Sequence, residues 1–362
     1  MPMQVAYLPE FLGCTGLLSP CSSIRTDHHL KLLAQHTGCL IRHVHQLATF
    51  DPWGVDLVFI NRLALSSAAE AHQLCSQLRH APAPIPLILD LDDDLLAIQA
   101  DHVDYAMIQP RLAALEILVA EADAVIVSTP ELAQALPRDA AAVHVLPNRV
   151  LHTKIRALPL QAFQGVSDVL YFGTASHRHE LQMLRPLFDP ASSHYTGLGL
   201  VVAGIADADS DADAAWYRTL AISHPCVDTF IDRLAGLRGF RCGLAPLRAN
   251  DPVNAAKSEI KIFDYSYLGL PVIASRCPPY QRAIQNRQTG FLVDDGIDSW
   301  AQALELIKSD ELCARLSAQA AAHLLAIAPT PASMLRSLQA ILERARSGST
   351  ARARAGSPPL PC

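Results

Sequence analysis

Two lysines set four residues apart are the side chains best placed to bind an anion. Lys257 and Lys261 belong to NAAKSEIKIFDYSYLGLPVIAS, residues 254–275. Apolar residues in this stretch follow helical spacing, so we predict one helix that carries both lysines. The helix should end at Gly269, before a buried parallel strand at Val272–Ile273. Free amides at the start of the helix, its dipole and two ammonium groups would together suit a diphosphate.

Alternating strands and helices should position this stretch, because such alternation predicts doubly wound parallel sheets. In the first half we expect strands at Val5–Leu8, Cys39–Val44, Asp56–Ile60, Ile85–Leu91, Ala124–Ser128 and Val143–Leu146. In the second half we expect them at Val169–Phe172, Leu198–Gly204, Val227–Phe230 and Cys242–Pro246, ahead of Val272–Ile273. Ligands of such sheets bind at the carboxyl ends of the strands.

Composition narrows the classes of function. The chain has 362 residues, enough for two domains, and is 50% hydrophobic and 18% charged. Its net charge of -6 argues against nucleic acid as the main partner. We see no apolar run of the roughly 20 residues that span a membrane and no signal peptide. The 9 cysteines form no C-x-x-C pair, so we expect a cytoplasmic protein with reduced thiols.

A glycine-bearing loop follows the first strand, but it lacks the G-x-G-x-x-G pattern of dinucleotide-binding proteins. Gly16 in this loop either makes a turn or faces a ligand. A helix should follow, capped by Ser22 or Ser23. Arg25 could be an ordinary surface arginine of that helix, or it could face a ligand.

Four aspartates, Asp90 and Asp92–Asp94, gather at one strand end in ILDLDDDLLAI. Clustered carboxylates can bind Mg²⁺ or Mn²⁺, but carboxylates at a strand end often cap a helix or close a turn. We favour the metal-free interpretation. His102, in a following loop, could face a ligand, although a lone histidine is usually structural or solvated.

The stretch from residue 254 resembles the signature of retaining glycosyltransferases of the GT-B fold, the family 4 or group 1 type. In that family a helix with a basic and an acidic residue precedes a G-x-P-V-[IV]-A-[ST] turn and strand. The resemblance extends through Pro278–Tyr280 and the TGFLV run at Thr289–Val293 to the stretch Asp294–Trp300. ADAVIVSTPELAQAL and VHVLPNRV also match, with Thr129 expected to cap a helix that begins at Pro130.

The resemblance implies an α/β protein with two Rossmann-like domains facing a central cleft. Residues 1–160 would form the acceptor-side domain and residues 161–310 the nucleotide-sugar-binding domain. Residues 311–346 would be helices, the last packing back on the first domain. The tail, residues 347–362, is rich in Gly, Pro, Ser and Arg, so we expect it to be disordered.

By the same resemblance, several residues would hold the donor. The diphosphate would be bound by Lys257, Ser258, Lys261, Gly173, Thr174, His177 and Arg178. Family members often have an Arg and a Lys after the glycine loop, where this chain has HRH at 177–179. They also often have two glutamates eight apart; here the second is Asp264, which would hold the ribose, and the first is Ala256. The donor sugar must then be held by other groups, such as Asn254 or Ser258.

We therefore expect a glycosyltransferase, of the hexosyl or related class, that uses no metal or cofactor and retains the anomeric configuration. Its partners would be a nucleotide-sugar donor and a glycan, lipid-linked or other acceptor. Arg25, Gly16 and His102 would be the acceptor-side residues; Arg25 could contact a phosphate or the acceptor, and His102 could bind the acceptor or the donor sugar. Peripheral contact with the inner face of a membrane is compatible with the arginines of the tail. We assign no catalytic residue. Alternatives are a catalytically silent binding subunit and a metal-dependent transferase that uses Asp90–Asp94.

Overall fold

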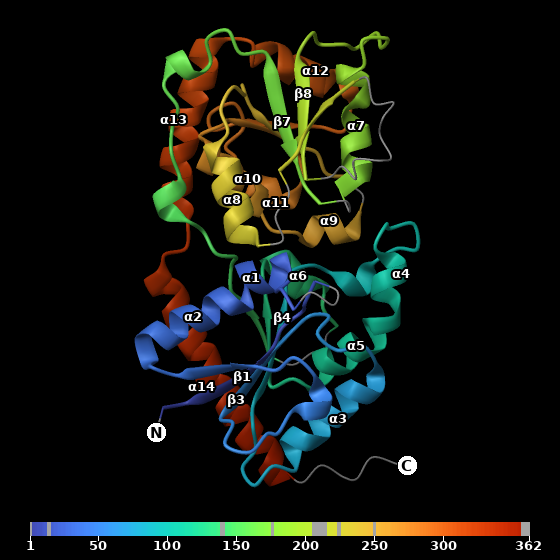
Figure 1. Ribbon diagram of the computed structural model, residues 1–362, viewed down its shortest axis with the longest axis vertical. Coiled ribbons are helices and arrows are strands. Elements are labelled where there is room, and N and C mark those ends of the chain that lie inside the picture. The colour runs from blue at the N-terminus through green and yellow to red at the C-terminus, as the bar shows by residue number, and fades with distance from the viewer. Residues whose placement is uncertain are drawn as a thin grey trace. The chain divides into compact units, whose positions relative to one another are not determined.

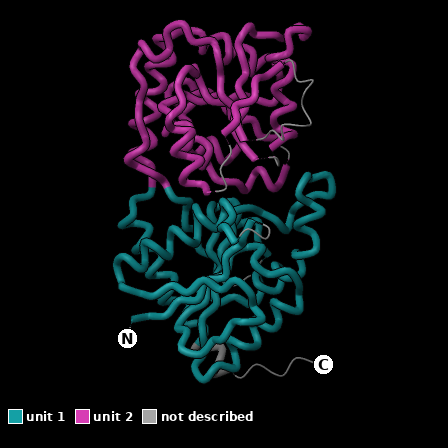
Figure 2. Tube along the Cα trace, viewed as in Figure 1, with its two compact units in different colours: residues 1–149, 329–362 teal, residues 150–328 magenta. Residues whose placement is uncertain are grey.

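A computed structural model describes residues 2–12, 16–137, 142–174, 177–204, 216–222, 226–248 and 251–355. The chain divides into two compact units: unit 1 contains residues 1–149 and 329–362, and unit 2 contains residues 150–328 (Figure 2). The first unit thus ends before residue 160, the predicted end of the first domain. From residue 150 onward the chain belongs to unit 2. The N–H of Leu151 donates to Tyr267 Oη, and the N–H of Arg156 donates to the Ser266 carbonyl.

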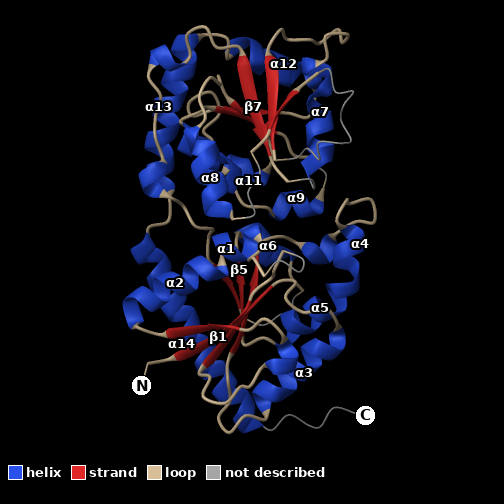
Figure 3. Cartoon of the chain, viewed as in Figure 1, coloured by secondary structure: helices blue, strands red, loops and turns tan. Residues whose placement is uncertain are grey.

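Unit 1 is built on a parallel sheet with the strand order β2-β1-β3-β4-β5-β6 (Figure 3). The strands are β1 (Gln4–Leu8), β2 (Leu40–His43), β3 (Leu57–Asn61), β4 (Leu87–Leu91), β5 (Ala124–Val127) and β6 (Val143–Val145). All six strands predicted for this half are confirmed. The central strands β3, β4 and β5 are buried along their whole length, as near-continuous apolar runs predict for a sheet covered on both faces.

The helices of unit 1 include one whose start differs from the prediction. They are α1 (Pro20–Ile24), α2 (Thr26–Thr37), α3 (Ala68–Arg79), α4 (Tyr105–Ile108), α5 (Leu112–Glu121), α6 (Pro130–Ala135) and α14 (Pro331–Ala355) (Figure 1). Ser19, not Ser22 or Ser23, caps α1, since its hydroxyl accepts from the Ser22 N–H and Pro20 suits the first helical position. Thr129 caps α6 with Pro130 following, as predicted.

The last helix, α14, belongs to unit 1 and packs beside α2 (Figure 1). Its buried residues share a core with β1, β3 and α2, namely Met334, Leu335, Leu338, Ile341, Leu342 and Ala345. The helix continues to Ala355, so the expectation of disorder from residue 347 is wrong for residues 347–355. Ala, Arg and Ser are all tolerated in helices, and Gly348 lowers helix propensity without ending it. Residues 356–362 lie outside the described residues.

Unit 2 has a second parallel sheet with the order β12-β11-β10-β7-β8-β9. Its strands are β7 (Asp168–Phe172), β8 (Gly199–Ala203), β9 (Arg218–Leu220), β10 (Gly243–Ala245), β11 (Val272–Ser275) and β12 (Phe291–Val293). The predicted strand at Val227–Phe230 is wrong, because this segment begins helix α8 (Val227–Gly236). Val227, Phe230 and Leu234 recur at helical spacing, and they pack on the core of the unit.

The other helices of unit 2 surround this sheet (Figure 1). They are α7 (Arg178–Phe188), α9 (Pro252–Ala256), α10 (Ile260–Leu268), α11 (Pro278–Gln281), α12 (Ile297–Leu306) and α13 (Asp310–Ile327). Across the described part of both units, no helix has the length and apolarity to cross a bilayer.

Each sheet has one point where the strand order reverses. In unit 1 this point lies between β1 and β3; in unit 2 it lies between β7 and β10. Connections on either side of such a point run to opposite faces of the sheet, which leaves a crevice at the carboxyl ends of the two strands. The topology therefore directs attention to the loops after β7 and β10 in unit 2, and after β1 and β3 in unit 1.

Tyr265 of α10 links the two strands at the reversal point of unit 2. Tyr265 Oη lies 3.0 Å from the Leu170 carbonyl of β7 and 2.7 Å from the Leu244 carbonyl of β10. Its ring packs against Gly243, where a Cβ would come within 2.2 Å of it. Gly243 is thus required so that α10 can approach the sheet, and this approach brings Lys261, one turn earlier, under the end of β7.

Candidate functional site

The two lysines lie on different elements, which corrects the prediction of one helix. Asp251 caps α9 through hydrogen bonds from the amides of Val253 and Asn254, and Lys257 ends that helix with extended backbone angles (φ -61, ψ 161). Helix α10 begins only at Ile260 and ends at Gly269, whose φ is 76. Lys257 and Ser258 therefore lie at the N-terminus of α10, as predicted, where free amides favour an anion.

An arginine that sequence analysis missed holds this connection in place. Arg282, directly after α11, donates to Glu259 Oε2 over 3.0 Å and to the Lys257 carbonyl over 2.8 Å. One bond holds the backbone of Lys257 and the other holds the side chain of Glu259, the residues on either side of Ser258. The sequence gives no sign of this role, because the partners of Arg282 are a backbone carbonyl and a residue 23 positions away.

Lys257 and Lys261 differ in environment. Lys257 is half-buried, and among the described residues no carboxylate lies within the 4.0 Å of an ion pair with its ammonium group. Lys261 is buried, with 8% exposure. Its Nζ donates to the Phe172 carbonyl over 3.1 Å and lies 5.0 Å from the Tyr171 ring centre. Burial, then the charge of Lys257, lowers the pKa of Lys261 to about 8.

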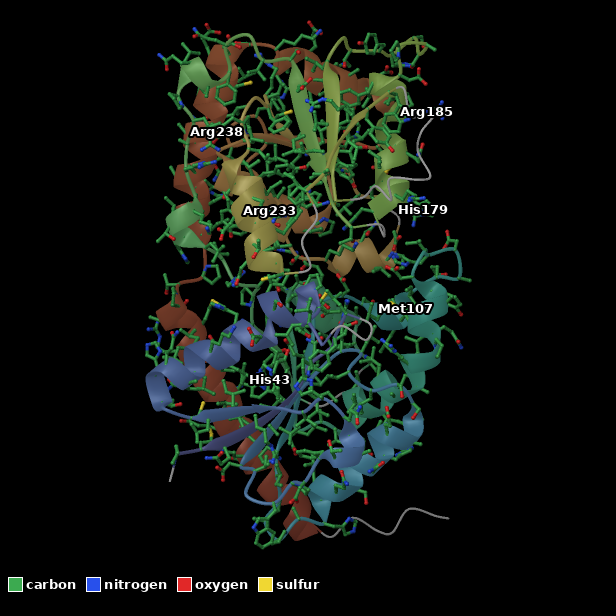
Figure 4. All side chains as sticks on the ribbon, viewed as in Figure 1. His43, Met107, His179, Arg185, Arg233 and Arg238 are labelled. Atoms are coloured by element: carbon green, nitrogen blue, oxygen red, sulfur yellow. The ribbon has the colours of Figure 1, made fainter. Side chains whose placement is uncertain are left out.

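The loop after β7 packs closely. A Cβ on Gly173 would come within 3.0 Å of the His177 ring, and one on Gly204, at φ +82, within 2.6 Å of the Gly173 carbonyl. Thr174 is exposed, and its carbonyl accepts from the His177 amide. Arg178 opens α7, followed by exposed His179 (Figure 4). Because Lys261 bonds to Phe172, this loop and the lysine connection meet at the reversal point of the sheet.

The predicted ribose and sugar contacts fall around the same helices. Asp264 is half-buried on α10, one turn after the buried Lys261. Asn254 is buried in α9, and its side-chain amide donates to the Arg248 carbonyl over 3.3 Å. Ala256 is also buried there. The Arg248 guanidinium pairs with Asp251 at 2.9 Å.

The predicted acceptor-side residues lie in unit 1 and do not form one cluster. Gly16 is exposed in a turn with φ 71. His102 is half-buried, and its Nδ1 accepts from the Asp104 amide over 3.1 Å. Arg25 is completely buried, with 0% exposure. Its guanidinium donates to Asp90, to Asn148 Oδ1 and to the Leu146 carbonyl, so it is a buried residue between α1 and α2 and not a surface arginine.

The aspartate cluster of unit 1 is bound to arginines. Asp90 pairs with Arg25 at 2.5 Å, and Asp92 and Asp93 pair with Arg62 at 3.0 and 3.4 Å. Although burial opposes it, the positive charge of Arg62 lowers the pKa of Asp92. Within the described ranges, no group of at least 3 His, Cys, Asp or Glu side chains is arranged to hold a metal ion.

The chain is similar in structure to several proteins of low sequence identity. No protein-family model and no curated protein matches it. Sucrose-phosphate synthase from Thermosynechococcus elongatus shares 15% identity at a TM-score of 0.65, over 94% of this chain and 98% of that one. Anabaena HepE in complex with UDP-glucose shares 14% identity at a TM-score of 0.61, over 95% of this chain and 100% of the HepE chain.

A longer neighbour is a variant of S. aureus TarM in complex with fondaparinux, α-GlcNAc-glycerol and UDP. It shares 13% identity at a TM-score of 0.53 over 79% of this chain, which spans 55% of the TarM chain, about half its length. Together with the two doubly wound sheets, these neighbours show the GT-B fold that sequence analysis predicted.

Proposed function

We propose that the chain is a glycosyltransferase that moves a sugar from a nucleotide-sugar donor to a glycan or related acceptor. The observation that carries this proposal is the cationic reversal point of unit 2. There Lys257, which has no carboxylate within 4.0 Å among the described residues, lies at the N-terminus of α10, and Lys261 of the same helix donates to the carbonyl of Phe172, next to Gly173. Structures of GT-B neighbours contain UDP or UDP-glucose, which supports a nucleotide diphosphate as the anion.

The chemistry of the proposal is stabilisation of a leaving diphosphate. Negative charge grows on the diphosphate as the bond to the sugar breaks, and preorganised cations and amides lower the energy of that state. Lys257 and the amides at the start of α10 would act from the exposed side, and the Arg282 bonds to Glu259 and the Lys257 carbonyl keep them oriented. Asp264 would accept from the ribose hydroxyls.

Retention of configuration and independence from metal are further parts of the proposal. The cations named above could supply the charge that Mg²⁺ supplies in other transferases, and Arg25 and Arg62 hold the aspartates of unit 1. We place the reaction in the cytoplasm, which agrees with seven described cysteines that are all free thiols: Cys21, Cys39, Cys75, Cys226, Cys242, Cys277 and Cys313. Membrane contact stays a prediction.

A thermal-shift panel of nucleoside diphosphates, with and without EDTA, tests the proposal. A ligand that binds only the folded protein raises Tm by mass action. We expect one diphosphate to raise Tm equally in both conditions and its sugar conjugate to be hydrolysed slowly or transferred. Stabilisation lost with EDTA would contradict metal independence.

A second candidate, a catalytically silent binding subunit, is favoured by Ala256, which is buried and has no polar group to hold the donor sugar. Binding of a nucleotide sugar without turnover of any acceptor would support this candidate. Failure of every nucleotide to bind would overturn the transferase proposal.

A further inference from the structure

Glu180 is a buried carboxylate whose presence sequence analysis did not explain. It lies in the first turn of α7 and is 5% exposed. Its Oε2 has no hydrogen-bond partner among the described residues. A buried carboxylate of this kind is costly unless charges around it compensate, so the groups that surround Glu180 decide what it does.

His177 is the first of these groups. Its Nδ1 lies 3.8 Å from Glu180 Oε2, an ion-pair distance when the imidazole is protonated. The opposite edge of the ring leans on Gly173, since a Cβ built there would be 3.0 Å from His177 Cδ2. The Cβ and Cγ atoms of His177 would lie 3.1 and 3.2 Å from the same Cβ, so the side of the residue that carries Cδ2, and not Nδ1, faces Gly173. Tyr171 Oη donates to the His177 carbonyl over 3.3 Å, which anchors the backbone.

Lys261 is the second group, because the charge of Glu180 supports its ammonium group against burial. The other charged groups that act on Lys261 are Lys257, which opposes its charge, and Asp264, which favours it. Two phenols also face Glu180, those of Tyr171 and Tyr280, and burial raises the pKa of each well above 10. They therefore do not titrate between pH 6 and 8.

We propose that Glu180 is a positioning residue that holds His177 as a cation beside Gly173, so that unit 2 takes up a proton when it binds a nucleoside diphosphate. The inference rests on the proposed function and adds to it a proton-linked contact. The proton comes from solvent, resides on the imidazole while the diphosphate is bound and returns to solvent when the ligand leaves. One carboxylate thereby serves two cations, His177 from α7 and Lys261 from α10.

The electrostatics support this arrangement. A carboxylate within about 4–6 Å favours the charged form of an imidazole, commonly by a factor of ten or more. Without the charge of Glu180, the imidazole would therefore lose its proton at lower pH. An arriving diphosphate adds negative charge on the Gly173 side and completes the protonation.

Isothermal titration of UDP-glucose into the full chain tests the proposal, because this ligand, unlike UDP, has no phosphate group that titrates between pH 6 and 8. The affinity is measured from pH 6 to 8, in buffers of different ionisation enthalpy, so that proton uptake is counted directly. For the wild type we expect uptake approaching one proton near neutral pH and an affinity that falls as pH rises. Glu180→Gln should weaken binding about five- to tenfold at pH 7.5. The loss should be much smaller at pH 6, because the imidazole is then protonated even without the neighbouring carboxylate.

His177→Gln should abolish the uptake below pH 7.5. The matched control is Glu305→Gln, an exposed carboxylate on α12 paired with Lys308, which should change nothing. Tighter binding by Glu180→Gln at every pH would show that the carboxylate only repels the ligand and would overturn the proposal. Uptake that persists in His177→Gln would assign the proton to Lys261 and also overturn it. If UDP and other diphosphates fail to bind the wild type, the proposed function itself is wrong.

Discussion

The reversal points of the two sheets carry opposite arrangements of charge. In unit 1, Arg62 lies at the end of β3 and is paired with Glu10, at 3.1 Å, and with Asp92 and Asp93. In unit 2, Lys257 has no carboxylate within 4.0 Å in the described part of the chain, and Lys261 bonds only to a carbonyl. At the same point of the topology, the arginine of unit 1 is thus neutralised by carboxylates, whereas Lys257 of unit 2 is not.

The contrast teaches which residues hold the fold and which can bind a ligand. Arginine forms several directed bonds at once, so buried Arg25 can join β4, the Leu146 carbonyl and Asn148. Lysine is a compact charge on a flexible stem and can turn toward an arriving anion. We therefore expect variants in unit 1 to affect stability and variants in unit 2 to affect ligand binding.

The largest expected effect is on the buried ion pair of unit 1. Arg25→Met should lower the free energy of unfolding by about 3–5 kcal/mol, because it leaves Asp90 as a buried charge without its partner. Denaturant unfolding measures the loss. The matched control is Arg79→Met, which breaks a partly exposed pair with Glu121 and should cost less than about 1 kcal/mol. Equal losses in the two variants would contradict the structural role of Arg25.

The next effect concerns ligand affinity. Lys257→Met should weaken nucleoside diphosphate binding roughly 10- to 100-fold, the usual range for a charge-assisted hydrogen bond, with little change in Tm. Asp93→Asn, at the aspartate cluster of unit 1, should leave the affinity unchanged. Titration of UDP into both variants makes the comparison. Similar affinities in the two variants would contradict the placement of the diphosphate in unit 2.

Lys261 should lower the stability of the fold and strengthen the binding of UDP. Its pKa, lowered from 10.5 to about 8, means that keeping the charge buried at pH 7 costs roughly 3 kcal/mol. Lys261→Met removes this cost but leaves the Phe172 carbonyl without its donor, a loss of about 1 kcal/mol. We therefore expect a net gain of about 2 kcal/mol at pH 7, together with weaker UDP binding. The gain should disappear above about pH 10, where the unfolded lysine is neutral too. A destabilised variant at pH 7 would refute the prediction.

The smallest effect depends on pH and belongs to unit 1. His29 is buried beside Arg25, and burial, followed by the charge of Arg25, lowers its pKa well below 6.5. The unfolded chain takes up a proton here below about pH 6.5 but the folded chain does not, so acid destabilises the fold. His29→Gln should remove about 1 kcal/mol of the stability lost between pH 7.5 and 5.5. His36→Gln, at an exposed position of α2, should leave the pH dependence unchanged, and an equal effect of both variants would exclude His29 as the source.

Much of the architecture was readable from local patterns. All six strands of unit 1 were predicted, since each is a short apolar run between turn residues. An error arose where a short apolar run fits both a strand and a helix. Val227–Phe230 was predicted as a strand, but apolar residues continue at helical spacing to Leu234, and the segment is a helix. The interruption between α9 and α10 was missed because it depends on Arg282 and its bonds across the unit.

The sequence alone therefore determined the alternation of strands and helices, the GT-B resemblance and the concentration of cations between residues 254 and 261. Only the tertiary structure decided how those charges are used. It paired Arg25 with Asp90, 65 residues away, buried Lys261 under Phe172, and brought Glu180 to His177 and Lys261. Burial and partners at long sequence separation set the energy of a charge, and neither is encoded in the local spacing of residues.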